Sequence, residues 1–374
     1  MRIGILSLVL HINFGGILQA FALQTVLERM GHEVFVLDKD RTFHKTVFRQ
    51  GLSFAKYLLL KFILRRDVVY YTPQDINRDR EKREQHTKAF VEKYIHRCIV
   101  KRIEPGVFNS VDAIVVGSDQ VWRPKYFKSQ WETGMEQAFL QFAVTSPIKR
   151  VAYAPSFGSD EWEYSEEETE KCKHLLHAFN AVSVREESAI TLCREKLCRY
   201  DVKLVLDPTL LLSKEDYIHL VDKAKIGKSA GNLLCYILDD SEDKQALVSR
   251  IAEERRLTPF YTNMQSKTSN NERVQPPVEQ WIRGFMDADF VVTDSFHACI
   301  FSIIFEKPFV VVGNVERGMA RFKSLLSMFF LENNLVCKVG DYDSSLTYDV
   351  SAQTKMVLEK KRNESLLFLT QSLV

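Results

Sequence analysis

Residues 288–305 read ADFVVTDSFHACIFSIIF, a buried-strand pattern at 290–293 that leads through a sharp turn into an apolar helix. The first turn of that helix carries Asp294, Ser295 and His297. Open α/β sheets bind ligands at the carboxyl ends of their strands, and the free NH groups of a helix start favour anions. The pattern therefore predicts a ligand site, and an N-cap beside an incidental histidine is the alternative.

The alternation of strand and helix patterns extends along the chain in both directions. Strand patterns occur at 3–9, 33–37, 113–116, 150–153, 181–184, 204–206, 233–238, 259–261, 290–293 and 309–312. This period is typical of βαβ units and parallel sheets, and 374 residues are enough for two cores. We expect an α/β protein with two Rossmann-like doubly wound domains, 1–209 and 210–374, facing a cleft. A last helical pattern at 352–373 is expected to cross back to the first domain.

Composition excludes several classes of protein. The net charge of +2 gives no argument for a nucleic-acid partner. Seven cysteines without a CxxC pair indicate reduced thiols in a cytoplasmic protein, and no metal site is expected. The apolar start at 1–10 is followed by Asn-Phe-Gly-Gly, which favours a first strand over a secretory signal.

An insertion at about 41–104 interrupts the alternation. Its first part, 41–66, has seven Lys or Arg residues, no acid, and many large apolar residues between them. This mixture predicts an interfacial helix in peripheral contact with the inner face of an anionic membrane. The alternative is a helix that packs on its own domain and exposes a basic edge.

Polar residues follow the first strand. Asn13, Gly15, Gly16 and Gln19 lie where that strand turns into a helix. Adjacent glycines let the backbone approach a ligand closely and leave NH groups free for an anion. The segment is neither GxGxxG nor a P-loop, so it does not indicate a nucleotide, and a tight turn is the alternative.

A second polar group follows the strand at 113–116. Ser118, Asp119, Gln120 and Trp122 come there in close succession. Asp119 is suited to accept a proton from a sugar hydroxyl, and Gln120 and Trp122 are suited to bind a sugar ring. An Asx-type turn with Trp122 in the core is the alternative.

Three further strands end near candidate binding groups. Ser156 follows one strand, and Arg185 ends another. A guanidinium is suited to bidentate contact with a carboxylate or phosphate, and an ion pair of Arg185 with Glu186 or Glu187 is the alternative. Arg317 and Arg321, after the strand at 309–312, are expected to reach an anion in the cleft or to form surface pairs.

Taken together and in order, these pieces resemble the polysaccharide pyruvyl transferase family. The resemblance spans about residues 3–330 and includes Leu206-Asp-Pro208, and Ala298 stands where the family often has glycine. The matching segments are Asn13-Phe-Gly-Gly-Ile-Leu-Gln19, Gly117-Ser-Asp-Gln-Val-Trp122, Tyr153-Ala-Pro-Ser-Phe-Gly158, Ser183-Val-Arg-Glu186, Leu206-Asp-Pro208 and Asp294-Ser-Phe-His297.

The resemblance implies a function and a fold. Such enzymes transfer pyruvate from phosphoenolpyruvate onto two hydroxyls of a sugar, which forms a cyclic ketal and releases phosphate. The resemblance further implies a fold like that of B-type glycosyltransferases and no cofactor beyond this donor. It makes Arg185 and His297 the donor-binding and catalytic pair and places Asp119 on the acceptor side. The expected acceptor is a lipid-linked oligosaccharide used for a capsule or exopolysaccharide.

The chemistry leaves two points open. Protonation of the donor methylene needs a general acid, so His297 is either that acid or a cation that holds phosphate. The rival functions are a B-type glycosyltransferase that uses a nucleotide sugar and a non-catalytic module that binds glycans or anions at the membrane face.

Overall fold

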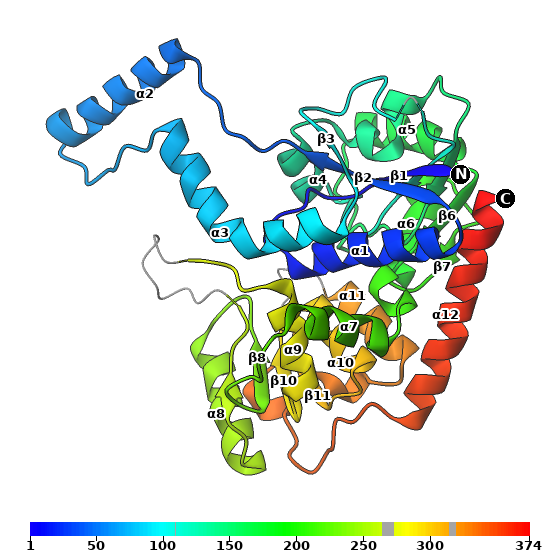
Figure 1. Ribbon diagram of the computed structural model, residues 1–374. Helices are drawn as coiled ribbons and strands as arrows, with labels where there is room; N and C mark the ends of the chain where they lie inside the picture. The colour runs from blue at the N-terminus through cyan, green and yellow to red at the C-terminus, as the bar shows by residue number, and fades with distance from the viewer. Residues whose placement is uncertain (109, 264–272, 314–318) are drawn as a thin grey trace.

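The structure, a computed structural model, describes residues 1–108, 110–263, 273–313 and 319–374, and it contains two parallel β-sheets (Figure 1). The first sheet has the strand order β3-β2-β1-β4-β5-β6-β7. Its strands are β1 (Arg2–Leu6), β2 (Glu33–Lys39), β3 (Arg97–Val100), β4 (Ala113–Val116), β5 (Lys149–Ala152), β6 (Ala181–Val184) and β7 (Lys203–Leu204).

The second sheet is smaller and has the order β12-β11-β10-β8-β9. Neighbouring strands pair in parallel in both sheets, as in Ile5 with Val36 and Val291 with Leu234. Its strands are β8 (Leu233–Tyr236), β9 (Pro259–Phe260), β10 (Phe290–Thr293), β11 (Phe309–Val312) and β12 (Leu335–Val336). Parallel strands joined through helices make each unit Rossmann-like, as the sequence predicts.

Helices connect the strands and cover the sheets. Many begin at a Ser, Thr or Asn cap, and Ser165 and Ser213 form capping boxes with a carboxylate three residues later. The helices are α1 (Phe14–Arg29), α2 (Val47–Leu58), α3 (Pro73–Tyr94), α4 (Pro124–Trp131), α5 (Glu166–His177), α6 (Glu187–Leu197), α7 (Lys214–Ala224), α8 (Glu242–Arg255), α9 (Val278–Asp287), α10 (Phe296–Ile304), α11 (Ala320–Met328) and α12 (Ala352–Leu373).

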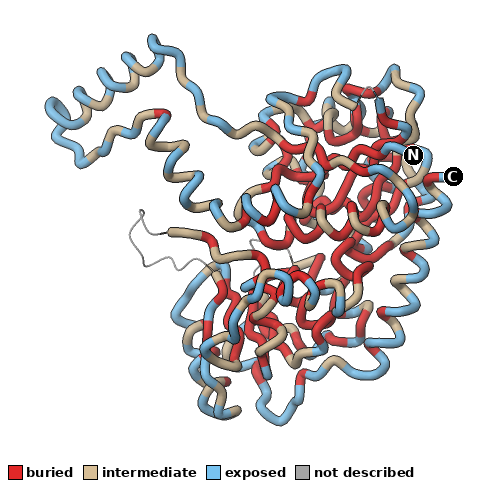
Figure 2. Tube along the Cα trace, viewed as in Figure 1, coloured by how far each residue is buried: buried red, intermediate tan, exposed pale blue. Residues whose placement is uncertain are grey.

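The central strands are buried on both faces, which explains their uninterrupted apolar sequences (Figure 2). One hydrophobic cluster joins the two units, because α1 of the first packs against β8 and α9 of the second. The Phe14 ring lies 5.5 Å from Trp281 and 6.3 Å from Tyr236, measured between ring centroids. This shared core fixes the start of α1 opposite the second sheet.

The last helix, α12, packs against the first unit. Ser365 accepts a hydrogen bond from the Leu206 backbone NH at 3.0 Å, and Arg362 donates to the Leu210 carbonyl at 2.8 Å. The Phe368 ring lies 6.3 Å from Tyr153. In Figure 1 the end of α12 and the N-terminus therefore appear on the same side of the first unit.

Two differences from the expected strands have local causes. β1 ends at Leu6 rather than at 9, because Val9 and Leu10 donate their NH groups to the side chains of Gln130 and Asp38. The edge strand β3 was not predicted, because its residues are only partly buried and lack a clear apolar pattern.

The basic first part of the insertion, residues 41–66, lies in an arm that leaves the body of the protein (Figure 1). In it, α2 continues into a π-helix, η1 (Leu59–Ile63), and neither element has a buried residue. The alternative of a helix packed on its own domain is therefore wrong for this segment. Among the described residues, no helix is both long and apolar enough to span a membrane.

Candidate active site

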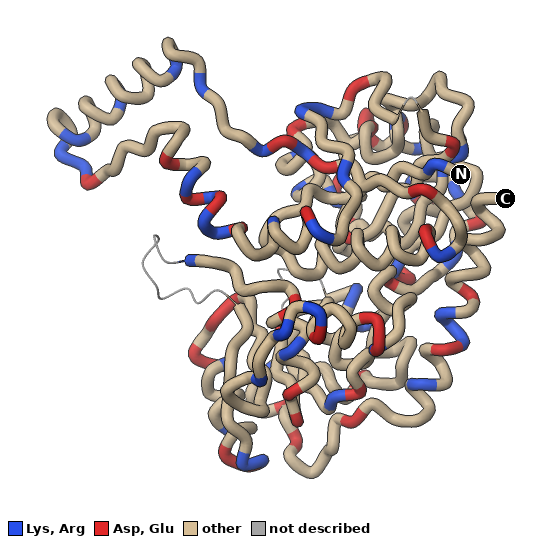
Figure 3. The backbone as a smooth tube through the Cα atoms, viewed as in Figure 1, with Lys and Arg blue, Asp and Glu red and all other residues tan. Residues whose placement is uncertain are grey.

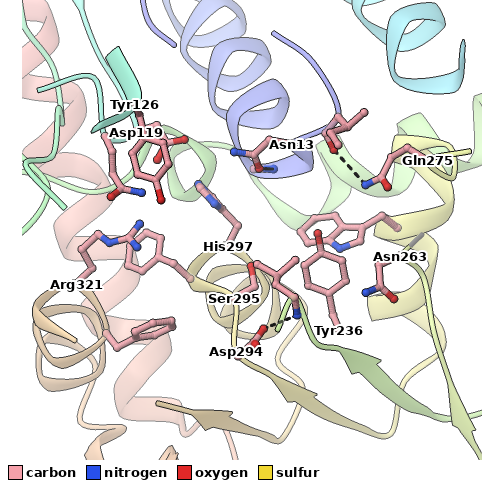
Figure 4. A pocket seen from close by; sticks show the side chains of 17 residues that line it. Asn13, Asp119, Tyr126, Tyr236, Asn263, Gln275, Asp294, Ser295, His297 and Arg321 are labelled. Atoms are coloured by element: carbon pink, nitrogen blue, oxygen red, sulfur yellow. Dashed lines mark hydrogen bonds between the residues drawn. The ribbon is translucent and has the colours of Figure 1, made fainter. Parts of the chain in front are cut away.

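A cavity of about 370 Å³ lies between the two units, where strands of both sheets end (Figure 4). Its walls combine residues that lie far apart in the sequence. They are Ile12, Asn13, Gly15, Asp119, Gln120, Tyr126, Tyr236, Leu238, Asn263, Gln275, Trp281, Asp294, Ser295, Phe296, His297, Arg321 and Phe322. This is the place where open α/β folds bind ligands.

His297 lies in the first turn of α10, directly after β10, and its side chain reaches across to the start of α1. A β-carbon added to Gly15 would lie 2.0 Å from its Nδ1, so only glycine lets the backbone approach this ring. Nε2 has no hydrogen-bond partner among the described residues and lies 3.8 Å from Asp207 Oδ2. Burial lowers the pKa of His297, and Arg185 and Arg321 add to this, although Asp207 and Asp119 oppose it.

Asp207 connects the groups behind the cavity. Its Oδ2 accepts hydrogen bonds from Gln19 Nε2 at 2.5 Å and from Arg185 Nη1 at 2.7 Å, and its Oδ1 accepts from Thr209. Burial favours the neutral acid, but the Arg185 and His297 charges and these hydrogen bonds outweigh it and lower the pKa of Asp207. Asp207 is therefore an ionised carboxylate that holds Arg185 by a hydrogen bond and lies near the His297 ring.

Arg185 is buried among three carboxylates. Besides the 2.7 Å contact with Asp207, Nη2 lies 3.7 Å from Asp119 and Nε lies 3.7 Å from Glu186. Nε and Nη2 have no hydrogen-bond acceptor among the described residues. Burial opposes its charge, but the carboxylates outweigh this and raise the pKa of Arg185. The guanidinium is held in place and still has donors to offer an anion.

The ring of Phe296 separates Arg185 from the cavity. The Arg185 guanidinium lies 4.4 Å from the centre of this ring, and that of Arg321 lies 5.4 Å from it. Arg321 lines the cavity itself (Figure 4). Burial, and then repulsion by Arg185, lower the pKa of Arg321 to about 10, so it remains a cation at neutral pH. This side of the site thus has one guanidinium at the cavity wall and a second one behind Phe296.

Asn13, Asp119 and Gln120 contribute polar groups to the cavity from the first unit. Asn13 accepts a hydrogen bond from the Gly15 NH and caps α1. Asp119 has a left-handed backbone with φ of 57°. Gln120 accepts from Arg123 at 3.1 Å. The first unit therefore adds a carboxylate to the cavity, and this carboxylate lies 3.7 Å from Arg185.

Several residues that the sequence proposed for substrate binding do not line the cavity. Gly16 faces Asn13 and Asp119, and Gln19 is committed to Asp207. The Ser118 and Ser156 side chains are buried and bonded to the backbone of Tyr153 and Gly158.

Trp122 and Asp294 require corrections. Trp122 is fully buried, stacks on Phe139 at 4.9 Å and donates to the Ala138 carbonyl, so it has no face open to a sugar. Asp294 lines the cavity, but its carboxylate accepts from Lys244 and from the NH groups of Leu238 and Asp239. Its role here is to hold the chain after β8. Arg317 lies outside the described residues.

The structure also adds residues that the sequence did not single out as a site. Asp207 is the most important, and its only signal was its place in the segment Leu206-Asp-Pro208. Tyr126 lies in α4, Asn263 and Gln275 lie in connections, and no recognisable sequence pattern marks any of the three. Among the described residues, no group of three or more His, Cys, Asp or Glu side chains is placed to hold a metal ion.

Two facing Rossmann-like units with a site in the cleft define an α/β protein with the architecture of B-type glycosyltransferases. The fold is similar to that of Arabidopsis thaliana UGT89C1 complexed with UDP-L-rhamnose, with a TM-score of 0.51, 8% identity, and coverage of 99% of this chain and 97% of that one. It is also similar to UDP-GlcNAc 2-epimerase from Neisseria meningitidis bound to UDP-GlcNAc, with a TM-score of 0.50, 10% identity, and coverage of 100% and 99%.

The sequence identifies the family more narrowly than the fold does. The family model of polysaccharide pyruvyl transferase matches residues 13–316. The chain belongs to this family, as the order of its motifs predicts, and is therefore an enzyme of the transferase class. No curated protein sequence matches the chain.

Proposed function

We propose that the protein transfers the enolpyruvyl group of phosphoenolpyruvate onto two hydroxyls of one sugar. A proton adds to the donor methylene, the first hydroxyl oxygen bonds to C2, and the C2–O bond to phosphate breaks with its electron pair leaving on phosphate. The second hydroxyl oxygen then bonds to C2. Both hydroxyls lose their protons: one balances the proton taken up by the methylene, and the other ends on the released phosphate. The products are a cyclic pyruvate ketal and inorganic phosphate.

One observation carries this proposal: a buried imidazole and a buried guanidinium share a cavity wall, backed by the Asp207–Arg185 pair. A donor with a carboxylate and a phosphate needs cations that stay charged after water is excluded. Arg321 and His297 face the cavity, and Arg185 lies behind Phe296 with two nitrogens lacking acceptors. The start of α10 at Ser295 adds favourable NH groups and helix dipole.

The residues then have separate roles. Arg321 holds one anionic group of the donor, and Arg185 reaches it after a small movement of Phe296 or acts through its charge. His297 takes a proton from solvent when the donor binds and delivers it to the methylene. Asp119, which lines the same cavity, orients the sugar hydroxyl and accepts its proton. The acceptor is a lipid-linked oligosaccharide, presented on the cytoplasmic side of the membrane.

The test is an incubation of the enzyme with phosphoenolpyruvate and a panel of glycans, followed by mass spectrometry and a phosphate assay. We expect phosphate release only with acceptor, without any nucleotide, and a product heavier by the mass of a pyruvate ketal. Turnover that requires a nucleotide sugar instead would assign the protein to the B-type glycosyltransferases. Binding of glycan without turnover would assign it to the non-catalytic class.

Donor binding should be linked to proton uptake by His297. Because burial lowers its pKa, the imidazole is neutral in the empty cavity at neutral pH, and a bound phosphate stabilises the protonated form. Above neutral pH the phosphate of the donor is fully ionised, so affinity should rise about tenfold for each unit of pH decrease. Calorimetry in buffers with different ionisation enthalpies should show uptake of one proton. Binding that involves no proton exchange would contradict this role.

A further inference from the structure

The basic arm, residues 41–72, is the largest feature that the reaction cavity leaves unexplained. It leaves the first sheet after β2, runs through α2 and η1, and returns to α3 (Figure 1). Its stem is fastened to α3 by two hydrogen bonds between Phe43 and Asn77, at 2.8 and 3.0 Å, and by an ion pair of Arg41 with Glu84. The arm is therefore held by α3 while its far part stands clear of the body.

One face of the arm stabilises the arm itself. The rings of Phe54 and Tyr57 pack against Tyr70 on the returning segment, with centroids 5.2 and 5.5 Å away, and the Tyr70 hydroxyl lies 3.4 Å from the Gln50 carbonyl. Lys61 donates to the Tyr57 hydroxyl at 2.8 Å. This small cluster uses the apolar side chains on one side of the helix only.

The opposite face carries large apolar side chains in water. Residues 48, 52 and 59 follow α-helical spacing and fall on the side away from Phe54 and Tyr57, and residues 62 and 63 of η1 continue the series of exposed apolar side chains. Phe48, Phe62 and Ile63 are 75%, 68% and 71% exposed. Burying such a side chain against a partner typically stabilises the complex. A contiguous exposed stripe of this kind therefore indicates a binding surface.

The charges on the arm are nearly all positive, and Asp67 is the one acidic residue in its sequence. Residues 41–66 contain seven Lys or Arg and no Asp or Glu (Figure 3). Arg49, Lys56, Arg65 and Arg66 form no ion pair with any carboxylate in the described part of the chain. Pairing of this surface with a second copy of itself would bring cations against cations, so the occupant must be anionic as well as apolar.

We propose that the arm binds the surface of an anionic lipid bilayer, with the stripe inserted among the lipids and the cations at the headgroups. A bilayer offers both features over the whole length of the arm, and an amphipathic helix with basic flanks is the element that binds there. The arm then holds the body of the protein beside the membrane without spanning it.

The stem of the arm connects this surface to the reaction cavity. A second cavity of about 420 Å³ lies between β2, β3 and α3, and Arg41 of the stem and His11 of the first strand-to-helix turn line it. Ile12 and Asn13, directly after His11, line the reaction cavity. If the proposed function holds, a lipid-linked sugar would reach the reaction cavity along this path while its lipid stays in the bilayer.

The experiment measures binding to vesicles without donor or acceptor, so that its result does not depend on the proposed reaction. The full chain is sedimented with vesicles of phosphatidylcholine alone and of equal parts phosphatidylcholine and phosphatidylglycerol. We expect binding to the anionic vesicles that weakens as salt is raised. The triple variant Arg49→Gln, Lys56→Gln, Arg66→Gln should lose on the order of a hundredfold in affinity, about fivefold for each cation.

A second variant tests the stripe and keeps the charge. Phe48→Ser, Phe62→Ser, Ile63→Ser should reduce binding at least as strongly, because these side chains supply the apolar contact. Matched controls on the far side of the molecule are Met356→Ser with Leu367→Ser for exposed apolar residues and Lys196→Gln with Lys360→Gln for cations, and these should bind like the wild type. None of the exchanged arm residues is buried, so thermal unfolding should not change.

Two results would overturn the proposal. One is equal sedimentation of the wild type and both arm variants with anionic vesicles. The other is a concentration-dependent dimer, found by sedimentation velocity without vesicles, that the arm variants abolish, because that would make a second copy the occupant. If the arm variants lost vesicle binding and still formed the ketal on a soluble acceptor, this would support membrane binding by the arm separately from the proposed reaction.

Discussion

Replacing His297 with asparagine is expected to lower kcat for ketal formation by about 10²–10⁴-fold, the usual contribution of a positioned acid or base. Asparagine keeps a polar side chain of similar reach but cannot transfer a proton at neutral pH. Because Nε2 has no hydrogen-bond partner among the described residues, stability should change by no more than about 1 kcal/mol. Steady-state kinetics and thermal unfolding measure the two effects separately.

The separate effects of this substitution on kcat and on KM show which role the imidazole has. A histidine that only holds phosphate would raise KM for the donor with kcat nearly unchanged, whereas a histidine that transfers the proton lowers kcat. The control is His219→Asn on an exposed position of α7, which should behave like the wild type. Wild-type values of both constants in His297→Asn would exclude His297 from the reaction.

The sequence was most informative where segments are short, apolar and interrupted by polar residues. The bounds of β4, β6, β10 and β11 match the predicted ranges, because a strand buried on both faces has a continuous apolar sequence and stops where polar residues begin. The bounds of the helix α12 also match. The same reasoning placed Asp119, Arg185 and His297 at strand ends, and the structure brings them to one end of the cleft.

The connections among these residues could not be predicted in the same way. Asp207 joins Gln19, Arg185 and His297, which lie on separate segments, and spacing along the chain gives no distance between them. Trp122 followed the pattern of a ligand-binding turn, yet Phe139, a residue in a different segment, covers its ring. Side-chain packing across segments determines such outcomes.

The arm shows a further limit of sequence patterns. An amphipathic helix has the same periodicity whether its apolar face packs on the protein or remains exposed. Only the structure shows that α2 and η1 have no buried residue and that Phe54 and Tyr57 pack with Tyr70 instead. The prediction of a membrane contact therefore rests on the orientation of the arm as much as on its composition.

Gly15→Ala is expected to lower kcat by about a hundredfold although it leaves every polar group in place. The added methyl would lie 2.0 Å from Nδ1 and 2.4 Å from Cγ of His297, so the ring or the start of α1 must move. A displacement of about 1 Å in a catalytic group costs on the order of 10²-fold in rate. Gly16→Ala adds the same methyl one residue later, 3.5 Å from Asn13 Nδ2, where it fits. That variant should lose little activity and gain about 0.5–1 kcal/mol of helix stability.

A double-mutant cycle shows whether the methyl acts through the imidazole. If displacement of His297 is its only effect, Gly15→Ala should cost about a hundredfold in the wild type and almost nothing in His297→Asn, since the group it displaces is gone. Equal costs in both backgrounds would mean that the methyl disturbs the donor or the α1 backbone directly. Wild-type activity of the single variant would contradict the close contact between the start of α1 and the His297 ring, on which the geometry of the site depends.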